Sequence, residues 1–157
     1  MPITILDGGM GGELKTRLEG AGSGLWSATA LRDAPELVVA LHKEYIEAGA
    51  RIIITNSYSA VPSYLAKAGL ADQYAAFAAL AGRLARQAME ESGENVAVAG
   101  SIPPLAESYR ADLVPPPEEA LPIYENVVKA LFPYVDLYIC ETMSSAEVSV
   151  SVSAPVS

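Results

Sequence analysis

The chain has 157 residues, 51% of them hydrophobic, with a net charge of −9, a pI near 4.5 and a mean hydropathy of +0.26. This composition favours one globular domain and excludes a disordered chain, while no apolar run approaches the roughly 20 residues that span a bilayer. The acidity disfavours nucleic acid and anionic membranes as partners, and the single cysteine and the lack of a signal-like start predict a cytoplasmic protein.

The first predicted element is a strand over residues 3–6, because this run is apolar and rich in β-branched residues. Asp7 follows at the strand end, and a helix is expected from Glu13 onward. Between them lie four glycines, which permit positive φ and close approach of a ligand. The stretch is also compatible with a simple strand-to-helix turn. A dinucleotide loop and a phosphate-binding P-loop are excluded, because leucine stands at the third glycine position and no Gly-Lys-Ser/Thr closes the turn.

Two helices and a loop are expected next. A short helix over 13–18 ends at a glycine-rich break, and a loop runs from Trp26 to about Asp33. Asp33 and Pro35 then predict a helix start, with Asp33 as the capping residue and Gly49 as the end. His42 lies within this helix. Because the chain has no second histidine, we interpret His42 as a surface or packing residue rather than a metal ligand.

A buried parallel strand is predicted over 51–55, from its continuous apolar run. Asn56 and Tyr58 follow at its carboxyl end, where parallel α/β proteins place binding sites. The alternative is an Asn-Ser turn that satisfies its own backbone. Helices over 62–68 and 70–91 lead to a third strand over 96–100.

The last predicted unit is a helix over 118–132 followed by a strand over 135–140. Glu141 stands at the end of this strand, as Asp7 does at the end of the first, and we interpret both as ligand-binding groups. A buried structural carboxylate is the alternative for Glu141. Cys140 is interpreted as a strand residue. Together these elements predict an α/β fold of parallel β/α units with right-handed crossovers.

Residues 148–153 alternate valine and serine, although a helix is expected there. The expected organisation is therefore a domain over 1–147 and an atypical tail over 148–157, as a frameshift or truncation would produce.

Four motifs resemble those of the homocysteine S-methyltransferase family and occur in the family's order. The family is a (β/α)₈ barrel, so the resemblance implies that residues 1–147 form the N-terminal half of such a TIM-type barrel. Gly12 and Pro103 depart from the family pattern, which has Thr or Ser and Gly there. The matching segments are Leu6-Asp7-Gly8-Gly9-Met10-Gly11-Gly12-Glu13-Leu14, Thr55-Asn56-Ser57-Tyr58-Ser59-Ala60, Gly100-Ser101-Ile102-Pro103-Pro104 and Glu141-Thr142-Met143.

The resemblance implies transfer of a methyl group to the thiol of homocysteine, which forms methionine. In the family, zinc held by three cysteines binds the thiol as a thiolate. Those ligands come from the second half of the barrel, so no zinc is expected on this chain. The implied substrate-binding residues are Asp7, Gly8, Gly9, Asn56, Tyr58 and Glu141.

Two hypotheses of different class follow. The chain is either part of a homocysteine methyltransferase, inactive alone, or a non-catalytic α/β binding or assembly module derived from one. The implied small-molecule partners are homocysteine and a methyl donor. Four parallel strands without closure also leave open edges, which predicts self-association.

Overall fold

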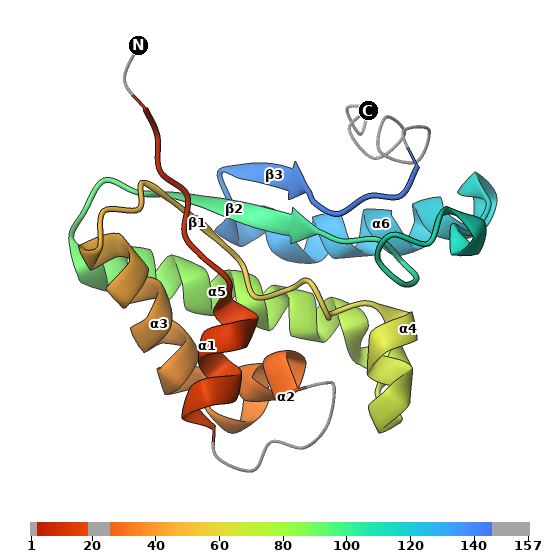
Figure 1. Ribbon diagram of the computed structural model, residues 1–157, viewed down its shortest axis with the longest axis horizontal. Coiled ribbons are helices and arrows are strands. Elements are labelled where there is room, and N and C mark those ends of the chain that lie inside the picture. The colour runs from red at the N-terminus through yellow and green to blue at the C-terminus, as the bar shows by residue number, and fades with distance from the viewer. Residues whose placement is uncertain (1–2, 19–25, 146–157) are drawn as a thin grey trace.

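The computed structural model describes residues 3–18 and 26–145, and these residues form a parallel β-sheet with helices packed on one of its faces (Figure 1). Within these ranges, four short 3₁₀ turns connect the longer elements: Ala66–Ala68, Ala71–Gln73, Ala111–Leu113 and Phe132–Tyr134. The helices are α1 (Met10–Arg17), α2 (Trp26–Asp33), α3 (Pro35–Glu47), α4 (Pro62–Leu65), α5 (Tyr74–Ser92) and α6 (Pro117–Leu131), and the strands are β1 (Ile52–Ile54), β2 (Ala97–Ile102) and β3 (Leu137–Cys140).

The strands lie in sequence order, β1-β2-β3, and all pair in parallel. Ile53 is opposite Val98, and Ile102 is opposite Cys140. This is the arrangement that successive β/α units produce, so the predicted α/β class with parallel strands is confirmed.

The predicted first strand is present only as an isolated parallel bridge between Leu6 and Ile52. The amide of Asp7 donates to the carbonyl of Ile52 at 3.0 Å, and the amide of Arg51 donates to the carbonyl of Ile5 at 2.8 Å. The segment therefore lies beside β1 and leads into α1 (Figure 1). Among the described residues it pairs along one side only, which leaves Ile3 and Ile5 exposed.

The core lies between the sheet and the helices. Ile53 points toward the helices and is fully buried, whereas Ile52 and Ile54 on the other face are only half-buried. The continuous apolar run of this strand had predicted that both of its faces are buried. In the described part of the structure, helices cover one face only. Among the described residues, no helix combines the length and the apolar character that crossing a membrane requires.

Two local predictions are wrong. Residues from Trp26 to Asp33 form α2 rather than a loop, and Ala28 and Leu31 on that helix are fully buried. Asp33 does not cap α3; its carboxylate pairs with Arg32 at 2.7 Å, and Ala34 occupies the cap position. Packing against the core, which local residue preferences do not reveal, stabilises α2 as a helix.

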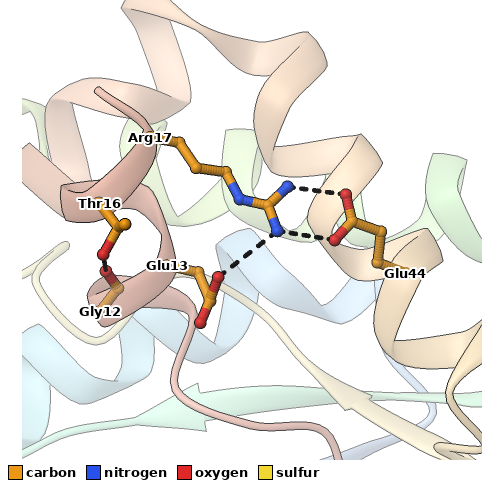
Figure 2. Close-up of polar contacts among 5 residues, drawn as sticks. All are labelled: Gly12, Glu13, Thr16, Arg17 and Glu44. Atoms are coloured by element: carbon orange, nitrogen blue, oxygen red, sulfur yellow. Dashed lines mark hydrogen bonds and ion pairs between the residues drawn. The ribbon is translucent and has the colours of Figure 1, made fainter. Parts of the chain in front are cut away.

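An ion pair joins α1 to α3 at the surface (Figure 2). Both terminal nitrogens of Arg17 contact the carboxylate of Glu44 at 2.7 Å, and Nη2 also lies 3.4 Å from Glu13. This two-point contact orients α1, and with it the glycine-rich segment that precedes α1.

The predicted tail over 148–157 lies outside the described residues. The boundary at residue 147 therefore stays a prediction.

Candidate functional site

A cleft of about 480 Å³ lies at the carboxyl ends of the strands. All six residues that the sequence singled out line it, although they come from three separate segments of the chain. The position is where parallel α/β folds place their sites. The lining residues are Asp7, Gly8, Gly9, Met10, Gly11, Ser27, Ile54, Thr55, Asn56, Tyr58, Ser59 and Glu141.

Asp7 lines the cleft with a side chain that is only 2% exposed. Its Oδ2 accepts a hydrogen bond from the amide of Ile54 at 2.8 Å. Burial raises the pKa of Asp7 to about 6; the Ile54 amide opposes this rise and the negative charge of Glu141 adds to it. A carboxylate in this state gains from a cation in the cleft, because the cation removes the repulsion and replaces lost hydration.

His42 lies directly behind Asp7. Its Nδ1 is 4.0 Å from Oδ2 of Asp7, its side chain is fully buried, and neither ring nitrogen has a hydrogen-bond partner among the described residues. Burial lowers the pKa of His42 to about 4, so the imidazole is neutral near pH 7. The sequence predicted a surface or packing residue; the structure places it in the core, beside the cleft carboxylate.

Glu141 is held by a chain of hydroxyl groups that crosses the sheet. The hydroxyl of Ser101 donates to Oε1 of Glu141 in a short hydrogen bond. The amide of Ser101 donates to Oγ1 of Thr55 at 3.0 Å, and Oγ of Ser57 donates to the carbonyl of Ser101 at 3.1 Å. This network therefore ties the side chain of Glu141 to β2.

The glycines of the opening segment have different requirements. A methyl group built on Gly8 would lie 2.9 Å from Cε1 of Tyr45 on α3, whereas one on Gly9 would meet nothing within 4 Å. Gly8 therefore fits because the chain passes closely over the tyrosine ring. Gly9 precedes α1, and no side chain caps that helix. Met10 and Gly11, in the first turn of α1, line the cleft.

Asn56 and Tyr58 hold the opposite wall in place. Asn56 accepts a hydrogen bond from the hydroxyl of Ser27 at 2.6 Å and donates to the carbonyl of Ser27 at 2.8 Å. The hydroxyl of Tyr58 lies 2.5 Å from that of Ser108, in the loop after β2. These two predicted site residues thus tie α2 and the loop after β2 to the end of β1.

The described residues do not fit a zinc site. Cys140 on β3 is their one thiol and His42 their one imidazole, and no group of three or more His, Cys, Asp or Glu residues among them is placed to hold a metal ion. Catalytic zinc requires three protein ligands that converge on one point. No chemical step through a metal follows from these residues.

Sequence reasoning missed several supporting residues. Tyr45, Ser27 and His42 touch the site residues from helices, where the sequence pattern carries no signal for them. Thr55 and Ser101 did carry a signal, since each is a small hydroxyl residue at the end of an apolar strand. The cleft as a whole combines two carboxylates with an uncapped helix N-terminus, an arrangement that suits a small molecule carrying both an ammonium and a carboxylate.

Comparison with known proteins gives a consistent family. The sequence model of the family described as "Homocysteine S-methyltransferase" matches residues 4–153. Homocysteine S-methyltransferase of Escherichia coli (strain K12) is 37% identical over 155 residues, which cover 90% of this chain and 50% of that protein. Homocysteine S-methyltransferase 1 of Arabidopsis thaliana is 41% identical over 64 residues, or 40% of this chain and 20% of that protein.

Solved structures agree with the sequence comparison. The metallated form of the homocysteine methyltransferase MmuM from E. coli matches with a TM-score of 0.81 and 33% identity, over 96% of this chain and 60% of that one. Its apo form matches with a TM-score of 0.66 and 30% identity, over 97% and 55%. This chain thus spans about half the length of its E. coli relative. On its sequence and its fold, the chain belongs to the homocysteine S-methyltransferase family.

Proposed function

We propose that the cleft binds the amino acid end of homocysteine, as part of a methyl transfer that forms methionine. The observation that carries the proposal is the convergence of Asp7 and Glu141 on one cleft beside the uncapped N-terminus of α1. The ammonium group lies between the two carboxylates, where it offsets the repulsion that contributes to the raised pKa of Asp7. The carboxylate group faces the first amides of α1, which carry partial positive charge.

The role of the described residues is therefore to bind and orient. The substrate thiol extends away from the two carboxylates and loses its proton to solvent. The thiolate sulfur then forms a bond to the methyl carbon of the donor, and the demethylated donor leaves with the electron pair of the bond that breaks. A free thiol near pKa ~8.5 is only a few per cent thiolate at neutral pH. Activation by zinc requires ligands that this set of residues lacks, so we propose that the chain alone neither binds catalytic zinc nor turns over.

Elemental analysis of the purified chain, combined with an assay of methionine formation from each class of methyl donor, tests the inactivity. We expect no stoichiometric zinc and no methionine. Zinc at one equivalent together with methionine production would overturn the proposal and require a metal site elsewhere in the chain.

Amide NMR titration with homocysteine tests the binding site itself. We expect the Gly8, Gly9 and Glu141 amides to move, with a dissociation constant in the millimolar range, which corresponds to about 4 kcal/mol. Asp7→Asn and Glu141→Gln should abolish the shifts.

Asp136→Asn is the matched control for the loss of a carboxylate. Asp136 also accepts a backbone amide from a neighbouring strand, that of Val98 at 2.7 Å, but it precedes β3 and does not line the cleft. Unchanged shifts in Asp7→Asn, or equal losses in all three variants, would contradict the proposed site. Complete absence of binding by the unaltered chain would favour the non-catalytic assembly module.

We further propose that the chain self-associates through its sheet edges, in the cytoplasm. The segment around Leu6 and strand β3 form the two ends of the described sheet, and Ile3 and Ile5 are 90% and 58% exposed. Exposed edges template pairing with another chain. Sedimentation at micromolar concentration should show dimers or larger species. Ile5→Lys should reduce their proportion, whereas the control Phe132→Lys, at an exposed site outside the strands, should leave it unchanged. A clean monomer would refute this.

A further inference from the structure

His42 is a buried polar side chain for which neither the core nor the cleft accounts. It is not among the lining residues of the cleft, and among the described residues it makes no hydrogen bond through either nitrogen. A neutral imidazole always carries one N–H donor and one acceptor. Leaving both unpaired in the core costs free energy, so a buried histidine in this state indicates a role beyond filling space.

The group within reach of His42 is Asp7. The distance of 4.0 Å between Nδ1 and Oδ2 exceeds a hydrogen bond. A side-chain rotation that closes it by about 1 Å makes a direct hydrogen bond. Ionisation of Asp7 favours this closure, because a carboxylate is a stronger acceptor than a carboxyl group.

We propose that His42 is a positioning residue for Asp7, and that its Nδ1–H donates to Oδ2 from behind the cleft and keeps the carboxylate ionised and facing the ligand. Oδ2 then receives donors from Ile54 and His42, which leaves Oδ1 for the ligand ammonium. The role in binding rests on the proposed function of the cleft, but the effect on Asp7 is measurable without a ligand.

The surroundings restrict which groups can titrate with this pair. The negative charge of Glu141, which directly follows β3, adds to the raised pKa of Asp7, and the charge of Asp7 adds to the raised pKa of Tyr45 on α3. Burial and neighbouring carboxylates raise the pKa of Tyr45, so it stays neutral in the relevant range. Lys43, next to His42 on α3, pairs with Glu91 on α5 at 3.1 Å. Among these groups, Asp7 is the one that lies 4.0 Å from a ring nitrogen of His42.

The first test needs no substitution. Long-range ¹H–¹⁵N spectra of the ¹⁵N-histidine-labelled chain report the tautomer of its one imidazole. We expect Nδ1–H at neutral pH. The Nε2–H tautomer would present a lone pair to Asp7 and would overturn the proposal.

The second test compares His42→Asn with His42→Phe. Asparagine keeps an N–H donor near the position of Nδ1, whereas phenylalanine keeps the ring shape without a donor. Titration of the Asp7 carboxyl ¹³C signal should give an acid dissociation constant at least about threefold lower in His42→Phe than in the unaltered chain. In His42→Asn the constant should return to the value of the unaltered chain. Equal constants in all three proteins would refute the positioning role, and failure of His42→Phe to fold leaves the tautomer and His42→Asn as tests.

Homocysteine titration of the same proteins separates the two proposals. A weaker affinity in His42→Phe than in His42→Asn supports both. If the acid dissociation constant of Asp7 is lower in His42→Phe but none of the three proteins binds homocysteine, the result supports the pairing of His42 with Asp7 and refutes the proposed function of the cleft.

Discussion

Replacing Asp7 with asparagine should stabilise the free protein near pH 7, although the same change should abolish binding. Burial raises the pKa of Asp7 from 3.8 to about 6, so the folded state holds its proton more tightly than the unfolded state. The stability that this group contributes is complete below pH 3.8, the pKa of Asp7 in the unfolded chain. It is lost as the pH rises through about 6, the pKa of Asp7 in the folded chain. At about 1.4 kcal/mol for each pKa unit, the loss near pH 7 is about 3 kcal/mol.

His42 has the opposite pH dependence over almost the same range. Burial lowers its pKa from 6.5 to about 4, so the unfolded state binds the proton more tightly and stability rises as pH increases through this interval. The gain is also about 3 kcal/mol. The two effects therefore nearly cancel in the unaltered chain between about pH 4 and pH 6.5. Asp7→Asn removes one of them, and its stability should rise by about 3 kcal/mol over that interval.

Urea unfolding followed by circular dichroism, from about pH 4 to about pH 7, measures both curves. The advantage of Asp7→Asn over the unaltered chain should grow from near zero to about 3 kcal/mol. Asp136→Asn is the control with the opposite sign. Although burial opposes it, the Val98 amide and Arg86 lower the pKa of Asp136, so the stability from this carboxylate is complete above the unfolded value of 3.8. Its loss should therefore destabilise the protein by a constant amount across this pH range. An advantage of Asp7→Asn that does not change with pH would refute the reasoning.

Two further substitutions test the support of the site. Gly8→Ala places a methyl group 2.9 Å from the ring of Tyr45 and should lower the free energy of unfolding by about 1–3 kcal/mol. Gly9→Ala, with open space around it, should change the free energy of unfolding by no more than about 0.5 kcal/mol. Equal effects of the two substitutions would contradict the close contact. Ser101→Ala removes the donor to Glu141 and should destabilise the fold by about 1 kcal/mol and weaken homocysteine binding severalfold in the amide titration. Unchanged binding would mean that Glu141 needs no such support.

Much of this site was predictable because parallel β/α units impose a simple rule. Strands that run in one direction bring their carboxyl ends to one edge of the sheet, so Asp7, Asn56 and Glu141 were expected together although up to 134 positions separate them. The hydrophobic runs also located β1, β2 and β3 to within a few residues. These features depend on local pattern and on chain direction, which the sequence contains.

The tertiary structure alone decided how those residues are supported. The place of His42 behind Asp7, of Tyr45 beneath Gly8 and of Ser101 beside Glu141 depends on which helix or strand packs against which. Side chains on one helix face have equivalent sequence spacing whether they meet an apolar core or a carboxylate. The sequence by itself therefore determined the order of the elements and the edge at which the cleft forms, and only packing determined the charge state and the orientation of the groups within it.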